Sequence, residues 1–157
     1  MGRQNALVKV SGDLCGREDV LEWIRKLSVE YFTVVLAGGG TQINEAFQKA
    51  GLKIKKHGPL GRETETLKES QLARDVLEEN QEKIQDLLAT RGVMATVVIP
   101  VLEIGTVLCH INGDVYILTA YLGFDKIFVL TYENRVKEKK RAFKKYPKIE
   151  VVGFPGE

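Results

Sequence analysis

The chain has 157 residues, 44% of them hydrophobic and 28% charged, which suits one globular domain with a buried core. Its longest apolar stretch, 94–102, is far shorter than the roughly 20 residues of a transmembrane helix, and no secretory signal pattern opens the sequence. We therefore expect a cytoplasmic protein without a membrane segment. Cys15 and Cys109 form neither a disulfide framework nor a ligand-spaced pair, which argues against a structural zinc site.

Short apolar runs alternate with longer segments of helical periodicity, which is the pattern of βα units. In chain order, we predict a strand over 6–10, a helix over 17–30, a strand over 32–37, a helix over 41–50, a loop or hairpin over 51–66, a long helix over 67–91, strands over 95–101 and 106–111, a helix over 114–122, and strands over 126–131 and 149–152. The all-apolar strands need cover on both faces. These elements predict an α/β fold, a three-layer αβα sandwich with a mainly parallel central sheet, in a single domain over 1–157.

Basic residues gather in the segment 135–145, although the net charge of the chain is only +2. A solvated helix or loop is the ordinary explanation of such a run, with Phe143 and Tyr146 as anchors to the core. No known nucleic-acid-binding motif accompanies the run, so we expect no nucleic-acid partner.

Consecutive glycines follow the second predicted strand, at the place where open α/β sheets bind their ligands. Gly38, Gly39 and Gly40 come after the strand, and Thr41 opens the next helix. Such glycines let the backbone approach an anion closely, and the helix N-terminus adds unpaired N–H groups. A tight turn between strand and helix explains the glycines alone equally well. The spacing matches neither the P-loop nor the dinucleotide-binding glycine pattern.

A lysine interrupts the first predicted strand. Lys9 is a lone charge in an apolar run, which is unusual enough that we interpret it as a site residue rather than a solvated strand end. Ser11 and Gly12 follow in the turn after this strand. We interpret His110 as a strand residue and predict no metal site, because His57 is distant in the sequence and no acidic partner has ligand spacing.

Five segments, in this order, resemble the successive motifs of the amino acid kinase family: LVKVSGD, VVLAGGGTQINEAFQKAG, GRETET, HINGD and LGFDKIFVLTYENRV. The resemblance covers most of the chain, and the ordered set is far more specific than any single segment. The glycine segment and GRETET look most like acetylglutamate kinases, whereas KVSGD is closer to uridylate kinases. The resemblance implies ATP-dependent phosphoryl transfer to a small anionic metabolite, with ATP and Mg²⁺ required, and a homodimer.

The resemblance also implies roles for particular residues. Lys9 and Asp114 match the catalytic pair, in which the lysine bridges the transferring phosphoryl group and the aspartate orients the catalytic lysines. Arg62 and Asn112 match the substrate-binding positions, and the arginine would grip the acceptor's carboxylate. The phosphate-binding set is Ser11, Gly12, Gly38, Gly39, Gly40 and Thr41. From the residues alone, Arg62 would be interpreted as a surface side chain, and Asp114 could equally serve the start of the next helix, which is compatible with a site role.

Several positions depart from the family pattern. His110 stands where the family has an asparagine, Gly113 replaces an alanine, and Tyr132 and Asn134 replace aspartates of the nucleotide side. The family's C-terminal glycine-rich segment carries a second catalytic lysine and most of the ATP pocket, and nothing in this sequence matches it. Substitutes would have to come from 137–145 or from another subunit.

Two functions of different classes fit these observations. In the first, the chain is a compact small-molecule kinase that phosphorylates a carboxylate or phosphate acceptor. In the second, it is a catalytically inactive module that binds an anion or small molecule, or assembles with a partner. The retained Lys9, glycines, Arg62 and Asp114 favour the first, and the missing second lysine favours the second. The apolar positions of the 67–91 helix favour a homodimer formed near it.

Overall fold

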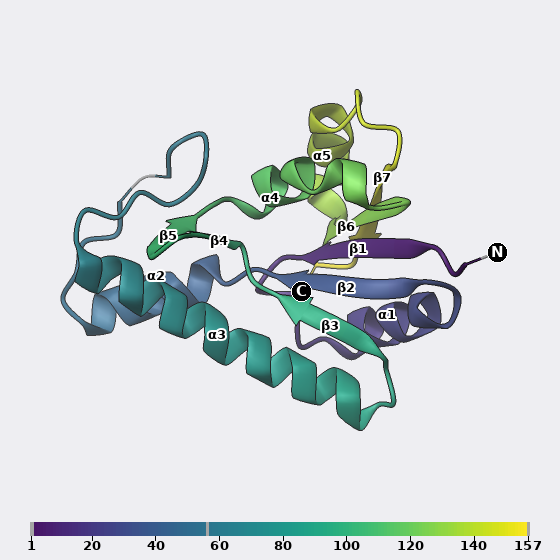
Figure 1. Cartoon of the computed structure of the whole chain (residues 1–157), viewed down its shortest axis with the longest axis horizontal. Helices are drawn as coiled ribbons and strands as arrows, with labels where there is room; N and C mark the ends of the chain where they lie inside the picture. Colours follow the sequence, from purple (N-terminus) through teal and green to yellow (C-terminus); the bar gives the residue numbers. More distant parts are fainter. Residues whose placement is uncertain (1, 56, 157) are drawn as a thin grey trace.

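The computed structural model describes residues 2–55 and 57–156 and contains a five-stranded sheet (Figure 1). The strand order is β3-β2-β1-β6-β7, and each neighbouring pair is parallel. Two further strands, β4 and β5, form an antiparallel hairpin. The strands are β1 (Asn5–Val10), β2 (Phe32–Ala37), β3 (Ala95–Val98), β4 (Val101–Ile104), β5 (Val107–His110), β6 (Lys126–Tyr132) and β7 (Ile149–Phe154).

Helices cover both faces of the five-stranded sheet (Figure 1). They are α1 (Glu18–Glu30), α2 (Gly40–Lys49), α3 (Leu67–Thr90), α4 (Gly113–Thr119) and α5 (Val136–Ala142), with short 3₁₀ turns η1 (Tyr121–Gly123) and η2 (Glu133–Arg135). Helix α1 and the C-terminal half of α3 lie on one face, and α4 and α5 lie on the other. The expected α/β architecture with a largely parallel central sheet is therefore confirmed.

The alternation of side chains along β1 decides what lies on each face. Ala6, Val8 and Val10 are buried against α1 and α3. Leu7 is buried on the opposite face, with side chains of α4 and α5. Lys9 is two positions after Leu7, so its side chain points to the same face of the sheet, toward α4 and α5. A charged side chain therefore lies at the edge of an apolar layer.

Helix α3 buries the residues predicted for its stripe: Ala73, Leu77, Ile84 and Leu88. Its first half packs against Ile43 and Phe47 of α2, beyond the end of the sheet, and its second half packs on the sheet itself. Thr66 caps the helix, because its hydroxyl accepts the Glu69 N–H. The loop prediction for 51–66 also holds, since the only pairing among its described residues is one isolated bridge.

The predicted strand over 95–101 is wrong in its extent. Strand β3 ends at Val98, and Val101 begins β4, which pairs with β5 instead of the central sheet. Pro100 lies between the two strands and has no N–H to donate to a ladder, so the chain turns there. The sequence prediction did not treat Pro100 as a break within the apolar run.

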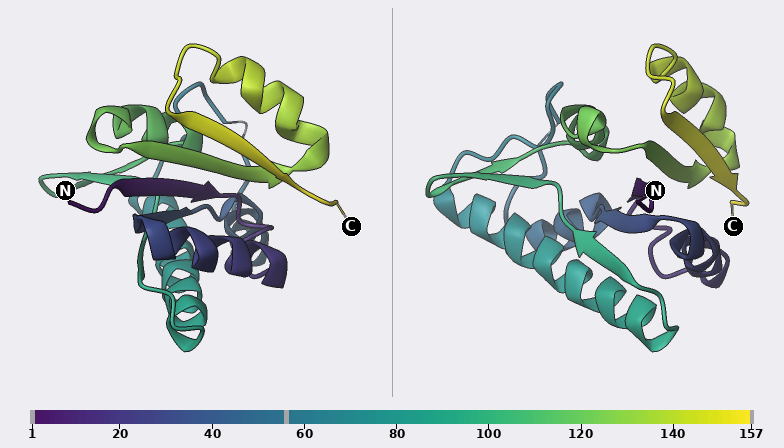
Figure 2. Two further views of the ribbon diagram at one scale, coloured as in Figure 1. Left: turned by 90° about the vertical axis from the view of Figure 1, so that its right-hand side faces the viewer. Right: turned by 45° about the vertical axis from the view of Figure 1, so that its right-hand side comes forward.

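Strand β1 is the point at which the chain changes direction across the sheet. On one side of β1 the sheet continues with β2 and β3, which come earlier in the chain, and on the other side with β6 and β7, which come later. Crevices form outside the carboxyl ends of strands at such a switch point. Helix α2, the described residues of the 51–66 loop and the β4–β5 hairpin all lie beyond these carboxyl ends, and Figure 2 shows the same arrangement from two further directions. None of the helices within residues 2–55 and 57–156 has the length and apolarity needed to cross a bilayer.

Candidate functional site

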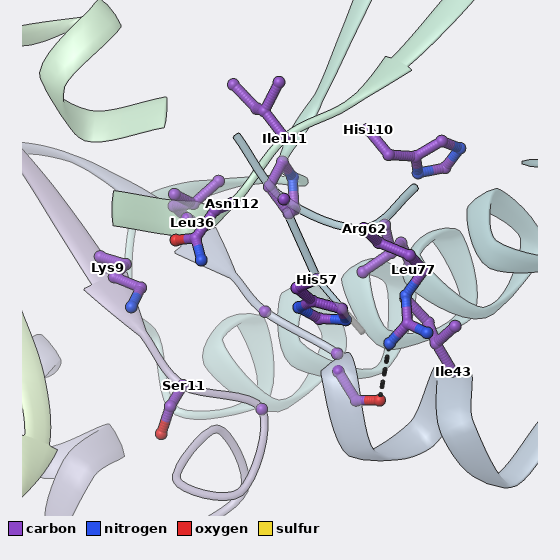
Figure 3. A pocket seen from close by; sticks show the side chains of 17 residues that line it. Lys9, Ser11, Leu36, Ile43, His57, Arg62, Leu77, His110, Ile111 and Asn112 are labelled. Carbon is purple, nitrogen blue, oxygen red and sulfur yellow. Dashed lines mark hydrogen bonds between the residues drawn. The ribbon is translucent and has the colours of Figure 1, made fainter. Parts of the chain in front are cut away.

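A cavity of about 210 Å³ opens at the carboxyl ends of β1 and β2 (Figure 3). Most of the predicted site residues line it: Lys9, Ser11, Gly12, Gly38, Gly39, Gly40, Arg62 and Asn112. Asp114 lies directly behind Lys9. Thr41 is exposed and does not line the cavity. The fold therefore brings together residues that are far apart in the sequence, such as Lys9 and Asn112.

The carboxylate of Asp114 holds two lysines at once. Lys9 Nζ lies 2.8 Å from Asp114 Oδ1, and Lys139 Nζ lies 2.5 Å from Asp114 Oδ2. The side chains of Lys9 and Lys139 expose only 15% and 11% of their surface, and that of Asp114 exposes 24%. The cluster has a net charge of +1, from two ammonium groups and one carboxylate. Of the three side chains, only that of Lys9 lines the cavity.

Burial and charge pull the ionisation of this cluster in opposite directions. Burial lowers the pKa of the Lys9 ammonium group, and the attraction of Asp114 only partly offsets it. Burial by itself would raise the pKa of the Asp114 carboxyl group, but Lys9 and Lys139 outweigh this effect, so the net pKa is lowered. Asp114 is therefore ionised at neutral pH and holds both lysines in place.

Lys139 is the member of this cluster that the sequence interpretation did not single out. It lies in α5, within the basic run, but it is only 8% exposed, whereas Lys140 beside it is exposed. Val136 and Phe143 mark the inner face of this helix, and Lys139 falls on that face at helical spacing. Its spacing from Val136 and Phe143 is a hint in the sequence, but a helix of seven residues is too short to display an apolar stripe.

The glycines after β1 and β2 approach one another closely. A Cβ atom on Gly12 would lie 3.2 Å from both the Gly38 carbonyl oxygen and Gly39 Cα, and one on Gly39 would lie 2.9 Å from Leu77 Cδ2. A side chain at either position would force its neighbours to shift, and the glycine backbone itself lines this part of the cavity. Gly39 is also the N-cap of α2, whose first N–H groups have no partner within the helix. The geometry is thus compatible with both explanations of the glycines, a tightly packed turn and an anion-binding site.

Arg62 lies at the other end of the cavity from Lys9 (Figure 3). Its Nη2 donates to Asn44 Oδ1 at 2.9 Å and to the Gly40 carbonyl at 3.3 Å. The guanidinium also lies over the ring of Phe47, with 5.4 Å between Cζ and the ring centroid. These contacts fix the orientation of a side chain that the residue pattern alone could have assigned to open surface.

Two histidines line the same cavity, although they are far apart in sequence. His110 lies in β5, as expected, and its Nε2 is 3.1 Å from the Ser70 carbonyl oxygen. Burial lowers the pKa of both His57 and His110, and the nearby charge of Arg62 lowers them further. Both imidazoles are therefore neutral at neutral pH. Within the part of the chain that the structure describes, no group of three or more His, Cys, Asp or Glu side chains could hold a metal ion.

Gly113 gives room to Lys9. A Cβ atom at this position would lie 2.7 Å from Lys9 Cε, so the stem of the lysine occupies the space of the missing side chain. Gly113→Ala is expected to displace the Lys9 ammonium group and to weaken oxyanion binding roughly tenfold, with a loss of stability of about 1 kcal/mol or less because the end of a lysine is flexible. Phosphate titration and urea unfolding would measure the two effects. Gly123→Ala is the matched control, since a Cβ there meets nothing within 4 Å, and an equal loss of binding in both variants would disprove this role.

Asn112 and Asp114 together build the start of α4. Asn112 is the N-cap, and its Oδ1 accepts the Asp114 N–H at 2.7 Å. Asp114 is thus a first-turn acid of α4, one of the two explanations that its position in the sequence allowed, and it is also the ion-pair partner of two lysines. Comparison with known proteins adds no assignment: no protein-family model matches the chain, and no curated protein sequence is detectably similar to it.

Proposed function

We propose that the chain is a small-molecule kinase of the amino acid kinase type, which transfers the γ-phosphoryl group of ATP to the carboxylate or phosphate of a small acid. The observation that carries this proposal is the Asp114 carboxylate between Lys9 and Lys139, next to a glycine-walled cavity. Phosphoryl transfer needs positioned positive charge more than covalent help from the protein. Lys9, which lines the cavity, would supply that charge, with Lys139 held next to it by the same carboxylate.

The transfer itself would proceed in line. An acceptor oxygen attacks the γ-phosphorus, an O–P bond forms, the bond from this phosphorus to the β–γ bridging oxygen breaks, and ADP leaves. Lys9 would stabilise the charge on the transferring group, and the Gly12 and Gly38–Gly40 backbone would cradle it. Arg62 would hold the acid group of the acceptor. Asp114 would position the lysines and would not itself take a proton, since its pKa is lowered.

Fewer residues are available to bind the phosphoryl donor, Mg-ATP. Mg²⁺ generally binds through substrate phosphates and one or two carboxylates, and the described residues offer no cluster of acidic ligands. Any Mg²⁺ would therefore arrive on the nucleotide, and we assign no residue to it. Pockets for drug-sized ligands measure roughly 300–1,000 Å³. At about 210 Å³, the cavity suits the acceptor and the transferring group rather than a whole nucleotide.

This small volume supports the second candidate, a module that binds a small anion without chemistry. Such a module would still need the donor groups of Lys9, Arg62 and the glycine turn, but not a pocket for adenosine. The double lysine arrangement favours the kinase, because a binding site alone has no need of a carboxylate that organises two cations.

A thermal-shift series with Mg-ATP, a non-hydrolysable ATP analogue, acyl amino acids, nucleoside monophosphates and inorganic phosphate separates the two candidates. Ligands that bind only the native state raise the melting temperature by mass action. The kinase proposal predicts a shift with Mg-ATP and with an acidic acceptor, and an additive effect when both are present. A shift with acids or phosphate but none with either nucleotide would replace the kinase by the binding module.

We also propose a homodimer located in the cytoplasm. The apolar stripe of α3, which first suggested a dimer, packs within the chain itself. Support comes instead from exposed apolar side chains near the start of α3 and on the β4–β5 hairpin, namely Leu67, Ile104 and Val107. Strand addition at β3 is disfavoured, because Gln81 and Gln85 already occupy its outer backbone groups at Ala95 and Val97.

A further inference from the structure

Strand β7 is an outer strand of the five-stranded sheet, as Figure 2 shows. Its backbone pairs with β6 on one side, where the Ile127 N–H donates to the Lys148 carbonyl at 3.0 Å. In a parallel ladder, alternate residues of a strand bond to the same neighbour. The N–H and C=O groups of Val152 therefore face β6, and those of Val151 and Gly153 face away from it.

These outward backbone groups have no hydrogen-bond partner within residues 2–55 and 57–156. The other outer strand, β3, is protected, because the side chains of Gln81 and Gln85 bind its outer backbone groups. Unpaired backbone at the edge of a sheet is a template on which a further strand can form. The chain thus closes one edge of its sheet and leaves the other edge open.

A groove of about 430 Å³ lies beside the open edge. Val151 lies on the α5 face of the sheet, and the side chain of its neighbour Glu150 points to the α1 face. Both residues line the groove, which therefore follows the border of the sheet instead of either face. A segment of extended chain in this groove would lie in the plane of the sheet, beside β7.

The groove is positively charged. Lys126, Lys140 and Lys144 line it, and Glu150 is the only acidic residue of its described lining. All three lysines are exposed. Lysines on an edge strand can serve to repel further strands. Here they belong to β6, to α5 and to the segment after α5, so they flank the edge of β7 without covering it, and they would attract a strand with acidic side chains.

We propose that the outer edge of β7 binds an extended, acidic segment of a partner protein as a sixth strand of the sheet. Hydrogen bonds to the backbone of Val151 and Gly153 would form the pairing, and acidic side chains would meet Lys140 and Lys144. Because side chains alternate along a strand, the residues between the acids would face the side of Glu150 and would be uncharged. Among the described residues, none lines both this groove and the cavity, so the proposal does not depend on the kinase.

Three octapeptides, blocked at both ends, test the proposal on the wild-type chain: alternating Glu and Val, alternating Lys and Val, and the fully N-methylated form of the first. The N-methylated peptide keeps every carboxylate but has no backbone N–H to donate. By fluorescence anisotropy at low ionic strength, we expect the Glu–Val peptide to bind roughly tenfold more tightly than either of the others. Equal binding of the N-methylated form would mean attraction by charge alone and would overturn the proposal, as would no binding of the Glu–Val peptide.

Amide hydrogen exchange, followed by NMR, locates the added strand. The Glu–Val peptide at saturation should slow the exchange of the Val151 and Gly153 N–H groups roughly tenfold or more, because both would become hydrogen-bonded. The Val152 N–H already faces β6, so its exchange should change far less, and it serves as the internal control. Binding of the peptide without protection of the two outward amides would overturn the proposal.

A charge reversal in the groove provides the third measurement. Lys144→Glu should weaken binding of the Glu–Val peptide roughly threefold or more, because it puts a negative charge beside the acidic strand. Lys145→Glu is the matched control, since Lys145 is also exposed but does not line the groove. Equal weakening in the two variants would overturn the proposed contact.

Two other occupants of the edge would be recognised in the same experiments, and either would overturn the proposal. Tighter binding of oligo(dT) than of the Glu–Val peptide, weakened by Lys144→Glu, would mean that the lysines serve a single-stranded nucleic acid. Protection of the Val151 and Gly153 amides in the chain alone, together with a dimer in sedimentation, would mean that a second copy of the chain occupies the edge.

Discussion

Lys139→Ala is expected to lower the rate of phosphoryl transfer by about 10²-fold or more, the usual effect of removing one positioned donor from a developing charge. Lys139 Nζ is bound to Asp114 Oδ2, and its side chain is nearly buried. Its loss would remove one of two cations and would release one oxygen of the carboxylate that positions Lys9. The measurement is the steady-state rate of ADP formation with a saturating acceptor.

Lys140→Ala provides the matched control. Lys140 is the next residue of α5, carries the same charge and is exposed. Its removal should leave the rate within about twofold of wild type, because an exposed charge is screened by solvent and salt. Equal effects of the two substitutions would mean that α5 acts only through its general positive charge, and the two-lysine site would have to be abandoned.

Asp114→Asn is expected to lower the free energy of unfolding by roughly 2–4 kcal/mol at pH 7. Breaking a fully buried ion pair costs about 3–5 kcal/mol, and the partial exposure of this carboxylate reduces the effect. The variant keeps the shape of the side chain but leaves Lys9 and Lys139 without their counter-ion. Urea titration would measure the change, with the exposed Asp86→Asn as control.

The pH dependence of the same variant has a definite sign. The pKa of Asp114 is lowered in the folded chain, so its stabilising contribution is complete above the unfolded-state value of about 3.9 and is lost as the pH falls through the folded-state value. The stability gap between wild type and Asp114→Asn should therefore close below about pH 4. Burial lowers the pKa of Lys9, and the variant lowers it further, so the variant should gain stability toward alkaline pH. A gap that stays constant across this range would contradict the ion-pair cluster.

Periodicity in the sequence predicted most of the fold because the elements are long and regular. Leu77 and Leu88 lie in the apolar stripe of a 24-residue helix, and both are buried where the stripe placed them. The predicted strand over 95–101 was too long, because apolar composition does not distinguish one strand from two. Pro100 was the residue that marked the break. Helix α5 has only seven residues, mostly charged, and its apolar face is too short to show a period.

The site was predictable where its residues belong to turns after strands, and not where they depend on tertiary contacts. Gly12 and Gly39 could be expected at a site because glycines after parallel strands permit close approach. Lys139 and His57 could not, because their place depends on how α5 and the 51–66 loop fold back on the sheet. Gly113 looked like an unexplained departure from the resembling family, and the structure gives it a local reason in the space that Lys9 occupies.

The proposal that Lys9 serves phosphoryl transfer is tested most directly with ATP labelled at the γ-phosphate. Wild-type chain and Lys9→Ala would be incubated with Mg-ATP and a mixture of N-acyl amino acids, simple carboxylates and alkyl phosphates, and label in small molecules other than ATP and free phosphate would be quantified. We predict labelled acceptor with wild type and a decrease of about 10²–10³-fold in Lys9→Ala. Binding of acids by wild type without any labelled product, or equal labelling by both proteins, would contradict the proposed kinase.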